Sequence, residues 1–430
     1  MILRDPVHGL VSFESEEESI VPALLETREV QRLRRIRQLG LTSLAYPGAD
    51  HTRFSHAIGA AFVMTRFIGR MRAIHHELPF WQRVTTERAR DALAAALLHD
   101  VGHGPFSHLF EEAMPDGPRH ETWTSRIIED PSTEVHQVLS RFDATLPSRV
   151  ADLVHGRHEL GFLARAVSGT FDVDRCDYLL RDAYFTGVGY GSFDLDWLLR
   201  SLRFGVPASA EAAPPLAIDG PKGLPAIESF ILARLFMFQQ VYFHKASRAS
   251  EWLLSRVLGR VRELIIDGTR VTGVPRAVAE LANDDDAPLG DYLALDDHGL
   301  MSAIDAWRSA SDPVLADLSE RLYTRKLFKT YELYGDATHP DAREEALSRA
   351  REIAKNAGLD PEVYVGLDCA SDLPFDDHDG SLTVIFPTGT PRPPGDVSYL
   401  LGRLRGQRLE RVRLIFAPEL REAIESALGQ

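Results

Sequence analysis

Apolar residues recur every three or four positions along much of the chain, which is the spacing of one buried face of an α-helix. This pattern predicts helices over about 20–25, 29–39, 53–75, 86–99 and 226–267, and more of them between 270 and 355. Short runs of apolar and β-branched residues favour strands instead at about 362–367, 382–387 and 411–416. The chain is therefore expected to be mostly α, with a helical core and a small α+β C-terminal appendage.

Shifts in composition divide the chain into three parts. A stretch rich in Ala, Pro and Gly at about 205–225 is typical of a hairpin or loop inserted into a larger unit. We expect a core over residues 1–260, a helical extension over 261–354 and a small α+β region over 355–430.

Charge and cysteine content narrow the classes of function. The chain has 48 Lys and Arg against 63 Asp and Glu, a net charge of −15, which argues against nucleic acid as the main partner. Cys176 and Cys369 are too few for a disulfide framework, and the first residues do not resemble a signal peptide, so a cytoplasmic protein is expected. No apolar run reaches the roughly 20 residues of a membrane span, so no membrane partner is expected.

The most informative stretch of the chain is residues 97–108, Leu-Leu-His-Asp-Val-Gly-His-Gly-Pro-Phe-Ser-His. It begins as the end of an apolar helix and changes character at the adjacent pair His99 and Asp100. Burying both groups without a partner would cost several kcal/mol. A hydrogen bond between the two side chains is one solution, and shared coordination of a divalent ion is another.

Two further polar groups lie in the first turns of predicted helices. His56 lies in the first turn of the predicted helix 53–75, and Asp174 opens a helical segment that also carries Tyr178 and Asp182. One ion held by His56, His99, Asp100 and Asp174 would have positions left for water and substrate. Histidine with carboxylate suits Mn, Fe, Zn or Ni better than Ca.

Other residues near these groups have the chemistry of phosphate-ester hydrolysis. Histidine titrates close to neutral pH, so one of His103, His108 and His120 could protonate a leaving alkoxide. Arginines at 53, 175 and 234 could hold the negative charge of a polyphosphate.

Three motifs, taken together, resemble the HD-domain phosphohydrolase superfamily, and within it the deoxynucleoside triphosphate triphosphohydrolases. The motifs are Arg53-Phe-Ser-His56, His99-Asp100-Val-Gly-His103-Gly-Pro-Phe-Ser-His108 and Asp174-Arg-Cys-Asp-Tyr178. The opening Asp5-Pro-Val-His-Gly and the segment 31–40 are similar to that family as well. The resemblance covers about residues 1–260 and implies an HD-domain helical core.

The resemblance also implies roles for individual residues. The metal ligands would be His56, His99, Asp100 and Asp174, and the catalytic residues would be His103, His108, His120 and Glu121, with Glu121 as the acidic partner of His120. The substrate-binding residues would be Gln38, Arg53, Arg175, Tyr178, Asp182, Arg234 and Tyr242. Tyr178 would pack below the deoxyribose and exclude a 2′-hydroxyl, while Arg175 replaces a lysine usual in the family.

The implied reaction is attack of water on the α-phosphorus, which releases a deoxynucleoside and intact triphosphate. The cofactor would be one divalent transition metal (Mn, Fe, Zn or Ni), with Mg²⁺ accompanying the nucleotide. A homo-oligomer, dimer or tetramer, is expected. Gln31 and Arg34 match part of the family's allosteric nucleotide site, but Glu26 stands where an aspartate is usual. Two alternatives remain open: an HD phosphohydrolase acting on another nucleotide, and a nucleotide sensor without catalysis.

Overall fold

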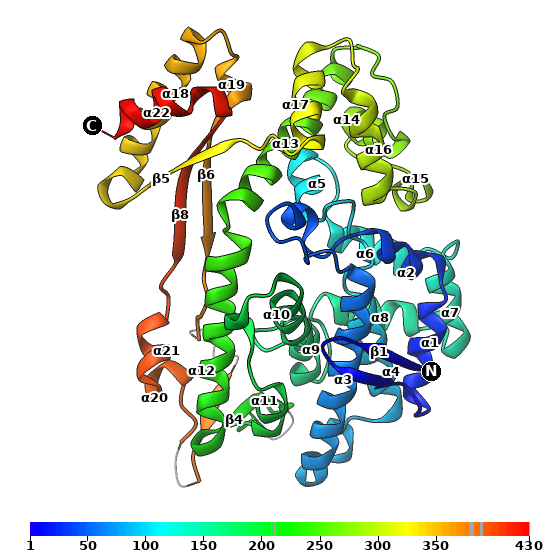
Figure 1. Ribbon diagram of the computed structural model, residues 1–430. Helices are drawn as coiled ribbons and strands as arrows, with labels where there is room; N and C mark the ends of the chain where they lie inside the picture. Colours follow the sequence, from blue (N-terminus) through cyan, green and yellow to red (C-terminus); the bar gives the residue numbers. More distant parts are fainter. Residues whose placement is uncertain (208, 210–211, 378–381, 388–389, 430) are drawn as a thin grey trace.

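A computed structural model describes the chain except residues 208, 210–211, 378–381, 388–389 and 430 (Figure 1). The predicted fold class is confirmed, because helices predominate and the strands in the described residues form three small sheets. The helices of the first half are α1 (Ile20–Leu25), α2 (Arg28–Arg32), α3 (Arg53–Ile74), α4 (Thr86–Leu98), α5 (His108–Ala113), α6 (His120–Glu129), α7 (Glu134–Phe142), α8 (Leu146–Val154), α9 (Gly161–Val167), α10 (Val173–Thr186) and α11 (Leu195–Ser201).

The second half is also largely helical. Its helices are α12 (Gly220–Met237), α13 (Lys245–Ile266), α14 (Arg276–Asp284), α15 (Leu289–Leu293), α16 (Asp297–Trp307), α17 (Pro313–Tyr323), α18 (Pro340–Asn356), α19 (Pro361–Tyr364), α20 (Pro394–Val397), α21 (Tyr399–Leu404) and α22 (Arg421–Leu428). None of the helices in the described part of the chain is both long enough and apolar enough to cross a membrane.

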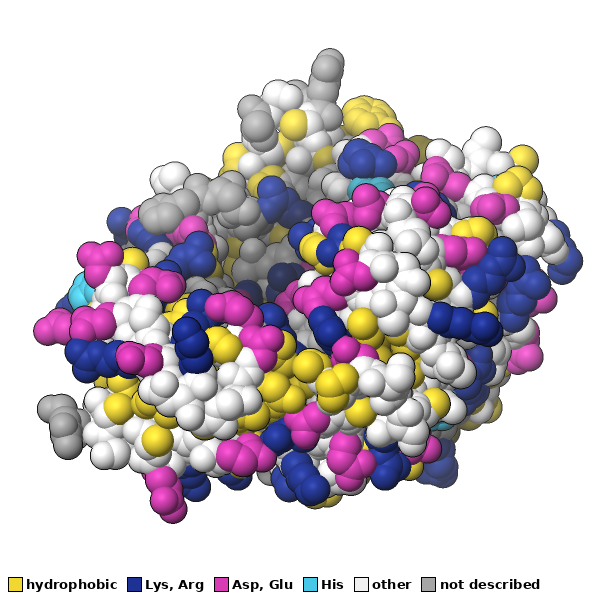
Figure 2. Space-filling model, turned by 90° about the horizontal axis from the view of Figure 1, so that it is seen from above, with side chains coloured by type: hydrophobic (Ala, Val, Ile, Leu, Met, Phe, Trp, Pro, Cys, Tyr) yellow, Lys and Arg dark blue, Asp and Glu magenta, His cyan; other side chains and the backbone are white. Residues whose placement is uncertain are grey.

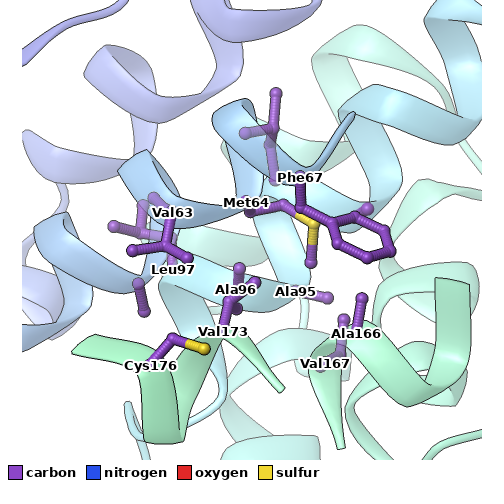
Figure 3. Close-up of a cluster of buried hydrophobic side chains, with 14 of the residues drawn as sticks. Val63, Met64, Phe67, Ala95, Ala96, Leu97, Ala166, Val167, Val173 and Cys176 are labelled. Atoms are coloured by element: carbon purple, nitrogen blue, oxygen red, sulfur yellow. The ribbon is translucent and has the colours of Figure 1, made fainter. Parts of the chain in front are cut away.

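The core of the first half is built from α3, α4, α9 and α10. Val63, Met64 and Phe67 of α3 face Ala95 and Ala96 of α4, with residues of α9 and α10 beneath them (Figure 3). The alanine-rich face of α4 has little side-chain bulk, which lets the other helices pack close to its axis. Each large apolar side chain buried in this way contributes about 1.5–3 kcal/mol. The first turns of α3 and α10 and the C-terminal end of α4 are thereby held in fixed positions.

The strands connect parts of the chain that are distant in sequence. A hairpin pairs β1 (Ile2–Asp5) with β2 (Gly9–Ser12). A second sheet has the order β3 (Leu202–Phe204), β4 (Leu216–Asp219), β7 (Thr383–Ile385), in which β4 and β7 run parallel. The third has the order β5 (Lys329–Leu333), β8 (Leu409–Phe416), β6 (Val365–Asp372), all antiparallel.

These pairings join regions that the sequence divides. Within the stretch 205–225, residues 205–215 link the antiparallel strands β3 and β4, residues 216–219 are β4 itself, and residues 220–225 begin α12. Strand β4 also pairs with a strand of the C-terminal region. Strand β5 comes before residue 355 yet belongs to the C-terminal sheet. The boundaries at residues 260 and 354 stay predictions, since the sheets alone do not define separate units.

Two predicted helices are interrupted. Helix α2 ends at Arg32, a 3-10 turn follows over Leu33–Arg35, and Arg37 then forms a β-bridge with Thr52. The prediction of a helix to residue 39 is therefore wrong, because the Arg37 N–H bonds to the Asp297 carboxylate (2.9 Å) instead of continuing a helix. The long region 226–267 is likewise divided, by a π-helical turn over Phe238–Tyr242 and the non-helical Phe243 and His244.

The surface seen from above carries acidic and basic side chains interspersed, with hydrophobic atoms between them (Figure 2). Many of the arginines are in ion pairs with Asp or Glu, such as Arg260 with Asp312 (2.7 Å) and Arg126 with Asp286 (2.6 Å). Acidic and basic side chains are therefore mixed on this face, and the basic ones do not form an extended stripe there.

Candidate active site

Four side chains meet where α3, α4 and α10 come together. The Nε2 atom of His56, in the first turn of α3, lies 3.3 Å from Nε2 of His99, which follows the last residue of α4. Asp174, in the first turn of α10, places Oδ1 at 3.0 Å from His56 Nε2 and 3.4 Å from His99 Nε2. Asp100 Oδ1 lies 3.5 Å from His99 Nε2. The structure thus brings together the four predicted metal ligands.

This donor set suits a transition-metal ion. Separations of this size are those expected between atoms that share one ion at about 2.0–2.2 Å, and two imidazoles with carboxylates match Mn, Fe, Zn or Ni. His56, His99 and Asp174 form a cluster capable of binding a metal ion. The fourth residue, Asp100, adjoins this cluster, and its Oδ2 is held by the guanidinium of Arg53.

The electrostatics of the cluster also favour a cation. Burial alone would lower the pKa of His56, but the carboxylates of Asp174 and Asp177 raise it to about 10. Burial would raise the pKa of Asp174, yet hydrogen bonds with His56 and His99 hold it below its usual range. Burial alone disfavours a charged group in this cluster, but the nearby carboxylates favour a positive charge there.

The sequence analysis did not single out the carboxylate that orients His56. Asp177 Oδ2 lies 2.8 Å from His56 Nδ1, and the same carboxylate accepts hydrogen bonds from Arg181 and contacts His8 Nε2 at 2.6 Å. Arg181 also donates to Asp5 at 2.8 Å, so the N-terminal hairpin is tied to this network. Partners of this kind fix the ring orientation of a metal-binding histidine. Its spacing could have indicated it, since Asp177 follows Asp174 by three residues and so lies on the same side of one helix.

A second cluster contains the predicted catalytic histidines. The rings of His103 and His120 stack with centroids 3.9 Å apart, and His108 lies 5.0 Å from each. His103 Nε2 is 3.3 Å from Asp100 Oδ1, which places the two clusters side by side.

A carboxylate that the sequence analysis missed is central to this second cluster. Glu111 Oε1 lies 2.9 Å from His120 Nδ1, and Oε2 lies 3.9 Å from His108 Nδ1. Burial would raise the pKa of Glu111, but its interactions with the imidazoles of His108 and His120 hold it well below the usual range. The predicted partner, Glu121, is farther from His120 Nδ1 (3.4 Å) and half exposed. Glu111 follows His108 by three residues, and that helical spacing could have indicated it.

The predicted sugar-contacting residues form a connected group beside the cluster of His56, His99 and Asp174. The Tyr178 ring lies 6.5 Å from that of His56 and 6.4 Å from that of Tyr242. The Tyr242 hydroxyl donates to Asp182 Oδ2 (2.7 Å), and His51 Nε2 lies 2.8 Å from Asp182 Oδ1. His51 is an additional residue here that the sequence analysis did not identify.

The predicted phosphate-contacting arginines each have a carboxylate partner in this structure. Arg53 pairs with Asp100 and donates to Ser107 Oγ at 2.9 Å. Arg175 pairs with Asp172, the N-cap residue of α10. Arg234 donates to Asp372 Oδ1 at 2.9 Å, and Asp372 comes from the last position of β6.

Gln38 lies in the segment that leaves the helical path after Arg35. Its backbone N–H donates to His51 O at 3.0 Å. Its buried Oε1 has no hydrogen-bond partner within the described residues. The roles assigned to Gln38 and to the other site residues stay predictions.

Comparisons with known proteins agree with this architecture. An HD domain model matches residues 53–182, and a model of the HD associated region matches residues 212–428. The uncharacterised protein YwfO of Bacillus subtilis is 36% identical over 87% of this chain and 81% of its own length. A phosphohydrolase of Bacteroides thetaiotaomicron superposes with a TM-score of 0.80 at 28% identity, covering 97% of this chain and 99% of that one.

A relative with a named activity matches a smaller part of the chain. The deoxynucleoside triphosphate triphosphohydrolase SAMHD1 homolog of Dictyostelium discoideum is 32% identical over 43% of this chain and 36% of its own length. The two family models together cover the helices that carry both histidine clusters and most of the second half. The chain belongs to the family of HD-domain phosphohydrolases that carry an HD associated region.

Proposed function

We propose that this protein hydrolyses deoxynucleoside triphosphates to a deoxynucleoside and inorganic triphosphate. The observation that carries the proposal is the 3.3 Å contact between Asp100 and His103, which sets the proposed metal ligands directly beside the cluster of His103, His108 and His120. A metal ion and a general acid that act at one phosphorus atom each accelerate hydrolysis of a phosphate ester. The named activity of the Dictyostelium relative supports the choice of substrate.

His56, His99, Asp100 and Asp174 would hold one divalent transition metal, Mn, Fe, Zn or Ni. When bound, such an ion supplies Lewis-acid activation of water and of a phosphoryl oxygen. Mg²⁺ would accompany the nucleotide. Asp177 keeps the His56 ring oriented through Nδ1 and so leaves Nε2 directed at the cluster.

His108 is proposed as the acid that protonates the leaving 5′-oxygen. Its side chain is 64% exposed, whereas that of His103 is buried, so His108 can reach a substrate in the site. His120 is held against Glu111, and in protonated form it would stabilise negative charge on the phosphoryl group.

Tyr178 and Tyr242 would form the floor under the sugar. A ring in van der Waals contact with C2′ leaves no volume for an added hydroxyl, which would select deoxyribose. Arg53, Arg175 and Arg234 would contact the phosphates, and the substrate would then replace or share their present carboxylate partners.

The proposed assembly, ligands and cellular location rest on the sequence analysis and on the resemblance to the deoxynucleoside triphosphate triphosphohydrolases. We propose a homo-oligomer, dimer or tetramer, in the cytoplasm, with deoxynucleoside triphosphates as the main ligands. Light scattering of the purified chain measures the assembly, and a monomer at micromolar concentration would contradict it.

One assay tests the proposed reaction against both alternatives. Each of the four dNTPs and four NTPs is incubated with the protein and Mn²⁺, Mg²⁺, Fe²⁺ or Co²⁺ in turn, and the products are separated by ion exchange. Inorganic triphosphate with deoxynucleoside is the expected result. Phosphate, pyrophosphate or a preference for NTPs would indicate another HD phosphohydrolase reaction. Binding without any product would indicate a sensor.

A further inference from the structure

The turn that precedes His108 has an unfavourable backbone conformation. Phe106 and Ser107 both have positive φ, at 54° and 59°. Residues with a side chain avoid this region, and a bulky residue such as Phe is a clear outlier there. Two such residues in succession persist only where the surrounding structure holds them.

A carboxylate from outside the HD match holds this turn. Asp297 is the first residue of α16, and its side chain is buried. Its Oδ1 accepts the N–H of Phe106 and its Oδ2 accepts the N–H of Arg37, each at 2.9 Å. Both oxygens are thus used by backbone donors from two separate segments of the core.

The same part of the helical extension contacts the rest of the turn. The Tyr292 hydroxyl donates to Gly102 O at 2.8 Å. The buried guanidinium of Arg32 donates to His103 O and to Leu295 O, each at 2.9 Å. The backbone from Gly102 to Phe106 is therefore fastened to the segment 292–297 at three points.

We propose that Asp297 is a positioning residue for His108. Its carboxylate keeps the strained Phe106–Ser107 turn closed and so places the His108 imidazole beside Glu111 and His103. The proposal rests on the proposed role of His108 as the acid. It assigns a function in the reaction to the helical extension, which contributes none of the predicted catalytic side chains.

A conservative substitution separates this role from simple packing. Asp297→Asn keeps the volume of the side chain but leaves one acceptor oxygen and turns an NH₂ group toward a backbone N–H. Asp296→Asn is a matched control on the neighbouring residue, because Asp296 caps α16 through the Gly299 N–H and pairs with Arg35 without contacting the turn. Asparagine is an equally good N-cap residue.

Two measurements on the full-length protein test the proposal. The first is hydrogen exchange of the peptide spanning residues 102–110 in the absence of substrate. Asp297→Asn is expected to lose at least about tenfold protection there, and Asp296→Asn to match the wild type. Should Asp297→Asn fail to fold, Asp297→Ser takes its place in both measurements.

The second measurement is turnover in a double-mutant cycle. Asp297→Asn should lower kcat by at least about tenfold with metal content and KM within about twofold of the wild type. In a His108→Asn background the same substitution should change kcat by less than about twofold, because its effect passes through His108.

Three results would overturn the positioning role. The first is unchanged hydrogen exchange in Asp297→Asn. The second is an equal fall in kcat in the wild-type and His108→Asn backgrounds. The third is a loss of metal together with a higher KM and a lower kcat, which would indicate general damage to the site. If the wild type hydrolyses no nucleotide, the proposed function fails, and the exchange experiment still decides whether Asp297 holds the turn.

Discussion

Asp100 lies between His56 and His99 on one side and the Arg53 guanidinium on the other. Asp100→Ala removes one proposed ligand, so metal and activity should be lost together while the protein stays folded. Elemental analysis and circular dichroism measure these outcomes. Asp116→Ala is the control, since Asp116 is exposed and forms an ion pair with Arg262 away from the site. Stoichiometric metal with near-normal turnover in Asp100→Ala would show that Asp100 is not a ligand.

Tyr178 is expected to set the preference for deoxyribose by its volume. Overpacking by one hydroxyl costs about 1–3 kcal/mol, so Tyr178→Ala should narrow the gap between dATP and ATP hydrolysis by a corresponding factor. The ratio of kcat/KM for the two nucleotides measures it. Tyr190→Ala, which removes an exposed ring of the neighbouring segment, should leave the ratio unchanged. An unaltered ratio in Tyr178→Ala would remove this residue from the account of specificity.

His108→Asn tests the source of the proton. General-acid help to a poor leaving group contributes about 10²–10⁴-fold, so kcat should fall by at least about 10²-fold while metal and substrate binding are retained. A substrate with a better leaving group needs less help and should recover part of the loss. Equal impairment on both substrates would mean that His108 is not the acid, and His120 would be tested next.

Among single residues, the sequence allowed prediction of those candidate site residues that belong to a short, recognisable motif. His99 and Asp100 are adjacent, His56 lies in the first turn of a helix with a long apolar face, and Asp174 opens a helix with polar groups along one side. Glu111 and Asp177 were within reach, since each follows a predicted site residue by one helical turn. Asp297 and Asp372 could not be identified, because no local pattern relates a carboxylate in the second half of the chain to a turn or an arginine of the core.

The contact between α3 and α10 depends on Gly59. A Cβ at this position would overlap the Asp177 carboxylate and the Arg181 guanidinium. Gly59→Ala should therefore destabilise the protein by about 1–3 kcal/mol through overpacking, and it should weaken metal binding because Asp177 orients His56. Urea unfolding and metal titration measure the two effects.

Gly69 provides the control on the same helix. A Cβ there meets nothing within 4 Å, so Gly69→Ala should be neutral or stabilising by up to about 1 kcal/mol. Equal behaviour of the two alanine variants would mean that α10 can move away from α3 without cost, and that close packing is not required at Gly59.

Helix periodicity predicted α3 and α4 to within a residue or two because their apolar faces are long and uninterrupted. It failed over residues 36–39, where the polar pattern still permits a helix. There the Arg37 N–H is taken by Asp297 and its backbone is bridged to Thr52. Tertiary hydrogen bonds of this kind override a local preference, and the sequence of the segment does not encode them.

Metal should stabilise the whole molecule as well as the site. A ligand present at 100 times its Kd adds about 2.7 kcal/mol to the free energy of unfolding. Removal of metal by a chelator should lower Tm, and added Mn²⁺ or Fe²⁺ should restore it. Asp174→Ala should show no metal-dependent change in Tm. A wild-type Tm that is independent of metal would indicate that the cluster binds no ion in the folded protein.

At the scale of the whole molecule, the mostly α class was predictable because it depends on the sum of many local patterns. The arrangement of the second half was not. Strand β4 is four residues long and β7 is three, and neither sequence indicates that the two pair in parallel. The pairing of Arg234 with Asp372 of β6 is another contact between distant parts of the chain.

That long-range pairing has a consequence for the order in which the protein is made. A ribosome delivers the residues of both histidine clusters long before it delivers Asp372 and β7. Until then, the Arg234 side chain lacks its carboxylate partner and one edge of β4 is unpaired. The long chain segment between β4 and β7 makes their pairing slow, and an exposed strand edge can pair with a non-native strand before it is complete. A message cut short after residue 355 would therefore encode every proposed catalytic group, yet its product would carry an unmatched arginine and an open strand edge.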